Sequence, residues 1–217
     1  MRSELESGLP LPPSWISMIF SDSHFKYLVT LQLISATLLF FYSQWVFVLF
    51  LLITHLIICI RFRGTFNGGS DMMKFVILTG ALFLTINENP MIQKLGLYYV
   101  AIHMFLSYFK AGWSKLMIQD WRTGMAIPSF LSRSLFLKAK RLSEFLLQYP
   151  LLSQTFSWLV IVFELGIVVL IFQPQLTPLY FALAMVFHFT NYVFFGLNRF
   201  FWIWLCGWPA LFYLKIL

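Results

Sequence analysis

Charged side chains are scarce in this sequence. Only 11% of its 217 residues are Asp, Glu, Lys or Arg, whereas 60% are apolar and 20% are aromatic. A soluble domain carries roughly 25% charged residues, because its surface must face water. The shortage argues against a soluble domain and predicts an all-α fold: a polytopic integral membrane helical bundle with about seven transmembrane helices plus an amphipathic interfacial helix.

Cysteines are few, and the motifs of soluble enzymes are missing. The two cysteines, Cys59 and Cys206, lie far apart in separate apolar runs, and no C-x-x-C or Cys/His ligand spacing indicates a redox or zinc site. No phosphate-binding, dinucleotide-binding, serine-hydrolase or zinc-protease motif occurs. We therefore expect buried thiols and no metal site. The net charge of +7 comes from basic residues between apolar runs, which indicates a lipid bilayer as partner and no nucleic acid.

The first 24 residues form a polar or interfacial segment rather than a cleavable signal, because they contain acidic residues and prolines but no apolar h-region. Residues 25–217 are expected to form a single transmembrane domain. Polar turns at residues 42–44, 61–69 and 87–90 and prolines near residue 174 divide it into apolar runs that approach the length of a span. The predicted spans are 25–41, 45–60, 72–86, 95–116, 156–172, 179–197 and 200–217.

Residues 119–153 alternate basic and apolar side chains at helical spacing, which predicts an amphipathic helix on an anionic lipid surface. The basic residues also set the orientation. With the N-terminus inside, the basic residues face the inner side except for Lys94 and Lys215. The positive-inside rule therefore predicts an N-terminus inside and a C-terminus outside.

Ionisable side chains within spans are costly, so each is a functional candidate. Glu164 and His188 lie about nine and about ten residues from the turn between the fifth and sixth spans, which places them at the same depth on antiparallel helices. Asn191 follows His188 on the same face. This arrangement indicates either a proton-handling or ligand-binding site in the middle of the bilayer, or a structural hydrogen bond that joins two helices.

The fourth span is polar on two faces. One stripe consists of His103, Ser107, Lys110 and Ser114, and the other face carries Tyr108, Gly112 and Lys115. One face is expected to line an internal cavity while Lys110 reaches toward the interface. The alternative for both lysines is that they extend to the lipid head groups.

The segment Tyr108-Phe-Lys-Ala-Gly-Trp-Ser-Lys-Leu116, followed by Trp121-Arg-Thr-Gly124, resembles the horizontally transferred transmembrane (HTTM) family, which is related to the membrane domain of vitamin K-dependent gamma-carboxylase. That family has a Tyr, then Ala-Gly-x-x-Lys-Leu, then Trp-x-x-Gly at similar spacing. The positions of Glu164 and His188 along the chain agree with the family as well, and the similarity runs from about residue 49 to the C-terminus.

In the carboxylase, the lysine that closes this block is the proposed base acting on vitamin K hydroquinone. The resemblance therefore implies a quinone or hydroquinone as cofactor. From helical spacing and the resemblance together, the candidate catalytic residues are Lys115, Glu164 and His188, and the candidate binding residues are Tyr108, Gly112, Trp121, His103 and Asn191.

The chain also departs from the carboxylase. It ends after the helical bundle, without the extramembrane portion that holds the carboxylase's protein substrate, and Gly68-Gly69 stand near the place of a functional histidine. Small bacterial relatives include one that matures a secreted peptide toxin together with a partner protein. The sequence thus predicts an enzyme or enzyme component in a bacterial inner membrane that acts on a peptide or a quinone-like molecule. The alternative is a non-catalytic subunit of a larger membrane complex.

Overall fold

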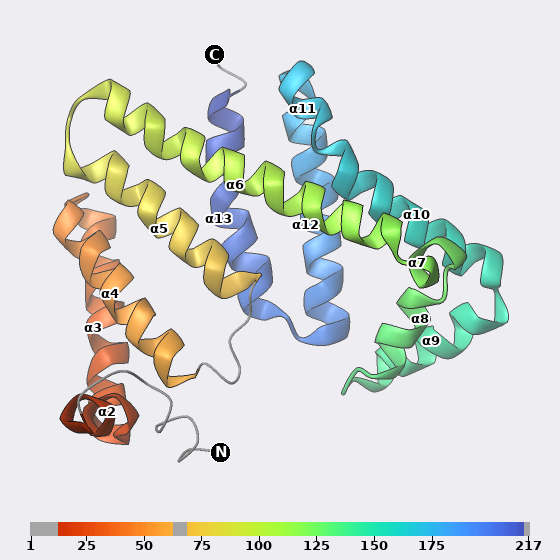
Figure 1. Cartoon of the computed structure of the whole chain (residues 1–217), viewed down its shortest axis with the longest axis horizontal. Coiled ribbons are helices and arrows are strands. Elements are labelled where there is room, and N and C mark those ends of the chain that lie inside the picture. Colours follow the sequence, from red (N-terminus) through yellow and green to blue (C-terminus); the bar gives the residue numbers. More distant parts are fainter. Residues whose placement is uncertain (1–12, 63–68, 215–217) are drawn as a thin grey trace. The chain divides into compact units, whose positions relative to one another are not determined.

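The structure, a computed structural model, describes residues 13–62 and 69–214, and every secondary-structure element in these ranges is a helix (Figure 1). The all-α prediction is therefore confirmed. The chain divides into two compact units, Met1–Tyr99 and Val100–Leu217, which are described separately below. Whether residues 25–217 act as a single domain stays a prediction.

The described residues of the first unit form α2 (Pro13–Phe20), α3 (Asp22–Phe41), α4 (Trp45–Arg61) and α5 (Ser70–Ile86), followed by the start of α6. Helix α4 packs against both α3 and α5. Val48 and Leu51 of α4 form an apolar cluster with Leu78 of α5. The break between α3 and α4 falls at residues 42–44, where polar side chains interrupt the apolar run as predicted.

The long helix α6 (Pro90–Met117) runs from the first unit into the second. It starts after the predicted Asn87–Pro90 turn, where the Asn89 side chain accepts a hydrogen bond from the backbone N–H of Met91 at 2.9 Å. Such a cap satisfies a backbone donor that the first helical turn leaves without a partner. Gly96 brings α6 close to α5, since a Cβ here would lie 2.7 Å from the Gly80 carbonyl oxygen.

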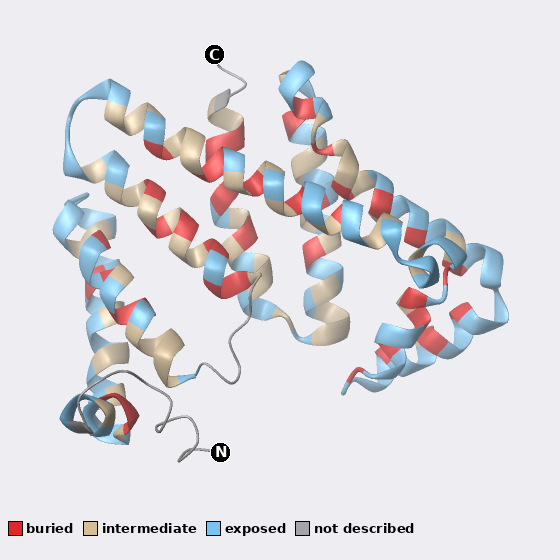
Figure 2. Cartoon of the chain, viewed as in Figure 1, coloured by how far each residue is buried: buried red, intermediate tan, exposed pale blue. Residues whose placement is uncertain are grey.

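The second unit continues with short helices and a closing hairpin. These elements are α7 (Gln119–Thr123), α8 (Ala126–Ser132), α9 (Leu137–Gln148), α10 (Pro150–Gly166), α11 (Val169–Phe172), η2 (Pro174–Leu176), α12 (Thr177–Phe195) and α13 (Asn198–Leu214). Helices α8 and α9 pack around Leu131, Ala139 and Leu146. Helices α12 and α13 form an antiparallel pair, and buried positions recur along both of them (Figure 2).

Helices occupy the predicted spans, except that the fifth is broken at residues 167–168 and residues 215–217 of the seventh lie outside the described residues. The count of seven crossings is not confirmed. Among the described residues, two helical stretches, Asp22–Phe41 and Pro174–Phe195, are long and apolar enough to cross a membrane alone. The α9–α10 pair adds a third if it forms one bent span. Helices α4, α5, α10 and α13 have only 17 residues each, about 26 Å of helix, which is the lower limit for a bilayer.

The predicted interfacial stretch 119–153 contains three short helices rather than one. Its last residues already belong to α10, which begins at Pro150 and ends at Gly166, so the fifth helix lies earlier than the predicted span 156–172. The two axes of α9 and α10 differ by 114°. Pro150 explains this boundary, because proline fits the first turn of a helix and cannot continue the preceding one.

Large apolar side chains cover much of the surface. Phe40, Leu151 and Phe172 are 82%, 78% and 76% exposed, and they belong to different helices. Soluble monomers rarely expose large contiguous apolar patches, whereas lipid tails are a favourable environment for such side chains. Together with the apolar helices, this surface identifies an integral membrane protein.

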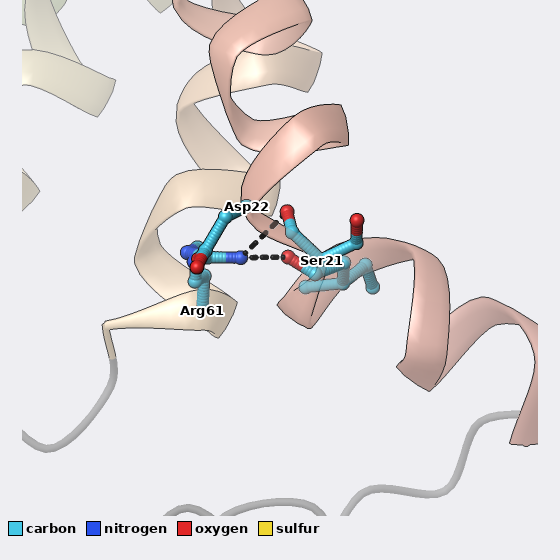
Figure 3. Close-up of polar contacts among 4 residues, drawn as sticks. Ser21, Asp22 and Arg61 are labelled. Carbon is cyan, nitrogen blue, oxygen red and sulfur yellow. Dashed lines mark hydrogen bonds and ion pairs between the residues drawn. The ribbon is translucent and has the colours of Figure 1, made fainter.

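Arg61, at the end of α4, joins α4 to the junction between α2 and α3 (Figure 3). Its guanidinium donates to the carbonyl oxygens of Ile19 at 2.8 Å and Ser21 at 3.1 Å, and it pairs with Asp22 at 2.6 Å. The Asp22 side chain is 84% exposed, whereas that of Arg61 is only 11% exposed. The two carbonyl contacts, which lie at the C-terminal end of α2, are therefore more important for stability than the ion pair.

Replacing Arg61 with Ala should lower the free energy of unfolding by about 2 kcal/mol, because two carbonyl oxygens lose a charged donor. The matched control is Asp22→Asn, which should cost less than about 1 kcal/mol because an exposed ion pair contributes little. Denaturant unfolding of both variants in mild detergent measures the difference. Equal losses would show that the ion pair, not the carbonyl contacts, holds α2.

Candidate active site in the second helical unit

One face of α6 points into the second unit. Tyr108 and Gly112 are buried, and the Lys115 side chain is 19% exposed. On the other predicted stripe, Lys110 and Ser114 are exposed. The Tyr108–Gly112–Lys115 face is therefore the one that meets the neighbouring helices.

Gly112 lets α6 and α10 approach each other closely. A Cβ at this position would lie 2.9 Å from the Glu164 Cβ and 2.9 Å from the backbone nitrogen of Leu165, which is too close for a side chain. Small residues at helix contacts in membranes allow such approach. The glycine of the Ala-Gly-x-x-Lys-Leu block thus brings the Lys115 side chain within reach of Glu164.

Lys115 and Glu164 form a bidentate ion pair. The Lys115 Nζ atom lies 2.7 Å from Oε1 and 2.6 Å from Oε2 of Glu164, whose side chain is only 4% exposed. The same Nζ atom lies 5.2 Å from the centre of the Trp121 ring, a distance at which an aromatic face attracts a cation. The lysine is therefore held between a carboxylate and an indole.

The Trp-x-x-Gly block holds Trp121 in this position. Gly124 ends α7 in the left-handed conformation with φ 84°, and a Cβ there would lie 2.5 Å from the backbone nitrogen of Gln154. The Ser153 hydroxyl donates to the Gly124 carbonyl at 2.6 Å, and the Gln154 amide donates to the Arg122 carbonyl at 2.9 Å. These contacts attach α7 to the start of α10, and they require a glycine at position 124.

Tyr108 contacts the second predicted site residue, His188 of α12. Its hydroxyl lies 2.6 Å from His188 Nε2, and both side chains are buried. The indole of Trp204 stacks on the imidazole with ring centres 5.3 Å apart and an angle of 21°. Phe187 and Phe200 pack edge-on against the same imidazole. His188 therefore lies in an aromatic enclosure.

Two polar atoms in this enclosure, His188 Nδ1 and Trp204 Nε1, are buried without a hydrogen-bond partner among the described residues. When the Tyr108 hydroxyl donates to Nε2, Nδ1 carries the imidazole proton, so both atoms are N–H donors. Buried donors without an acceptor are rare and unfavourable. The enclosure is therefore suited to an acceptor such as a carbonyl oxygen.

Glu164 and His188 do not bond to each other, contrary to the structural interpretation of their equal depth. Each is instead joined to α6, Glu164 through Lys115 and His188 through Tyr108. The Asn191 amide donates to the Phe187 carbonyl of its own helix at 3.1 Å, and His103 lies half-buried earlier on α6. Trp204 was not among the predicted site residues, because the last span is rich in aromatic residues at helical spacing and nothing in the pattern distinguishes it.

These features define an integral membrane protein whose second helical unit encloses a Lys–Glu pair and a Tyr–His pair on one helix face. The chain belongs to the HTTM family: an HTTM domain matches residues 70–215. The resemblance carried by the Ala-Gly-x-x-Lys-Leu block is thereby confirmed. The comparisons with curated proteins and with solved structures each found no match.

Substituting Lys115 with Met should destabilise the protein by about 3–5 kcal/mol, because it leaves the Glu164 carboxylate buried without its partner. The double variant Lys115→Met, Glu164→Gln should recover most of this loss, since no unpaired charge remains. Unfolding in detergent of both variants and of Glu164→Gln completes a double-mutant cycle. Additive losses in the double variant would show that the pair does not couple α6 to α10.

Proposed function

We propose that this HTTM protein is a membrane-embedded enzyme, or the membrane component of one, that transfers a proton to or from a lipophilic quinone-like molecule. The observation that carries the proposal is the Lys115–Glu164 ion pair. It lies on the face of α6 that meets the neighbouring helices, two helical turns from the Tyr108–His188 pair. The family resemblance suggests the maturation of a small secreted peptide, together with a partner protein, as the setting for this chemistry.

The ion pair has the chemistry that a base requires. Moving one proton from the Lys115 ammonium to the Glu164 carboxylate converts two charges into two neutral groups, and the contact distances of 2.6 and 2.7 Å permit this transfer directly. The neutral amine then accepts a proton from a quinol hydroxyl. Glu164 then releases its proton to water, which restores the charged pair, so the net result is one proton moved from the quinol to water.

The aromatic enclosure supports the choice of ligand. The donors His188 Nδ1 and Trp204 Nε1 suit a quinone carbonyl oxygen, and the surrounding rings suit a planar aromatic ligand. A cavity of about 210 Å³ lies in the same unit and opens between α6, α11, α12 and α13. Its lining is largely apolar and includes Phe105, one turn before Tyr108, so it supports a lipid-soluble side chain on the ligand.

The conservative variant Lys115→Arg tests the role as a base. Arginine preserves the positive charge opposite Glu164, but its guanidinium is not deprotonated in proteins. Purified protein in nanodiscs should bind a short-chain menaquinol and shift its ultraviolet absorption to that of the monoanion. The Kd of Lys115→Arg for the menaquinol should lie within about threefold of the wild-type Kd, which is a difference in binding free energy of about 0.7 kcal/mol or less. The absorption of the bound menaquinol should remain that of the neutral quinol.

Two results would contradict the proposal. If wild-type protein binds no menaquinol, the quinone-like substrate is wrong. If Lys115→Arg shifts the absorption as wild type does, Lys115 is not the base. The control Lys110→Arg changes an exposed lysine of the same helix and should leave both measurements unchanged.

The alternative function is that of a non-catalytic subunit in a larger membrane complex. The observation that favours it is the mutual satisfaction of Lys115 and Glu164, since a buried ion pair also serves to fix the register of two helices. Under this alternative Lys115→Arg, which preserves the pair, supports assembly and function as well as wild type does. The menaquinol experiment therefore separates the two functions.

We also propose that the chain crosses a bacterial inner membrane seven times, with the N-terminus inside and the C-terminus outside. The 17-residue helices then cross a locally thinned bilayer. Alkaline phosphatase fused after residue 87 or residue 214 should be active, whereas a fusion after Arg133 should be inactive and a fluorescent protein there should fold. If the phosphatase fusions after Arg133 and after residue 214 are both active, the chain does not cross the membrane three times between these two positions.

A further inference from the structure

A polar stripe on α6 takes no part in the candidate active site. It consists of His103, Ser107, Lys110 and Ser114, which recur at helical spacing. Lys110 and Ser114 are exposed, whereas Gly112 is buried in the contact with α10. The helices that enclose the active site therefore leave the outer part of this stripe uncovered.

Large apolar side chains lie beside Lys110 on the same side of the helix. Leu106, Phe109 and Trp113 are 51%, 39% and 50% exposed. With Lys110 they occupy positions i, i+3, i+4 and i+7, which is the spacing that a helix uses to dock against a partner. The rings of Phe109 and Trp113 stack with centres 6.1 Å apart and an angle of 20°. These four residues and Ser114 form the Lys110 face.

The depth of Lys110 makes the lack of a partner costly. From Lys94 to Lys115, α6 measures about 32 Å, which is close to the hydrocarbon thickness of about 30 Å. With α6 crossing the membrane as proposed, Lys110 lies about 8 Å inside the boundary near Lys115. Side chains of a helix lean toward its N-terminus, so the Lys110 stem points away from that boundary. Its ammonium makes no hydrogen bond, ion pair or aromatic contact with the described residues, and it therefore needs an acceptor within the membrane.

The described part of a second copy of this chain does not supply that acceptor. Glu164 is the described carboxylate that lies furthest inside a long apolar helix, and it is already bound to Lys115. The other described acidic residues lie at the starts of helices, in a turn or in short helices: Asp22, Asp71, Glu88, Asp120 and Glu144. A carboxylate at the depth of Lys110 must therefore come from a different protein.

We infer that the Lys110 face docks a transmembrane helix of a different protein, and that an Asp or Glu of this helix pairs with the Lys110 ammonium. The stacked rings of Phe109 and Trp113 then pack against its apolar side chains, and the small side chain of Ser114 lets the two backbones approach. Lys110 lies about 140° around α6 from Lys115, so the partner helix does not enter the active site.

The inference rests on the proposed crossing by α6 and not on the role of Lys115 as a base. The phosphatase fusions after residues 87 and 133 test that crossing separately, and the menaquinol experiment tests the base. A failure of the inference is therefore distinguishable from a failure of the proposed function.

The test uses the full chain in nanodiscs of phosphatidylcholine, which carries no net charge. The probe is a synthetic helix of about 22 Leu and Ala residues, long enough to span the bilayer, with one Glu about five residues from its end. Energy transfer between a dye on the chain and a dye on the peptide measures binding. Wild-type protein should bind the Glu peptide about 5–30-fold more tightly than a matched Gln peptide, as expected for one polar contact between helices in a membrane.

Variants of Lys110 assign this preference to its charge. Lys110→Met should bind the two peptides equally, whereas Lys110→Arg should retain the preference for Glu. Lys110→Glu should reject the Glu peptide and bind a peptide with Lys at the same position. The matched control is Lys94→Met, which removes a lysine near the other end of α6 and should bind both peptides as wild type does.

The proposal is overturned if wild-type protein binds neither peptide or binds both equally, because Lys110 is then satisfied by lipid phosphate or by the chain itself. It is also overturned if Lys110→Met retains the preference for Glu, or if Lys94→Met loses it. The first comparison uses wild-type protein, so a variant that fails to fold does not leave the proposal untested.

Discussion

The close contact of α6 with α10 at Gly112 is the constraint on which the rest of the second unit depends. Only a hydrogen side chain at this position lets the two backbones meet, and Lys115 reaches Glu164 because they do. The ring of Trp121, from α7, lies beside the Lys115 ammonium, and the Ser153 hydroxyl attaches α7 to α10 by donating to the Gly124 carbonyl. A sequence block of a few residues thus determines the packing of three helices.

The same helix face supports a second buried pair with a different character. Tyr108 and His188 are neutral groups within an aromatic enclosure, whereas Lys115 and Glu164 are charged partners near the end of α6. In the function proposed above, His188 Nδ1 and Trp204 Nε1 donate to a ligand oxygen, and the ion pair on the same face accepts a proton. All four residues belong to the second unit, Val100–Leu217.

Hydropathy predicted the helices well because burial in lipid requires continuous apolar runs, and the breaks at residues 42–44 and 87–89 coincide with polar side chains. It did not predict the early start of α10, since Pro150 lies among apolar residues and a window of hydropathy ignores its missing N–H. Spacing drew attention to Glu164 and His188, and the family resemblance drew attention to Lys115 and Tyr108, but spacing alone paired Glu164 with His188. Equal depth on two helices does not determine toward which neighbouring helix each side chain points. Here Glu164 and His188 both contact side chains of α6.

The glycine contact also has a consequence for how such sequences can vary. Any larger residue at position 112 requires α10 to move away or to present a smaller surface at Glu164 and Leu165. Changes in these two helices are therefore coupled, and a substitution that is acceptable in one sequence background is damaging in another. Related chains should preserve the fit as a matched set, so that exchanging α6 alone between two relatives disrupts the unit even when each helix is native to its own protein.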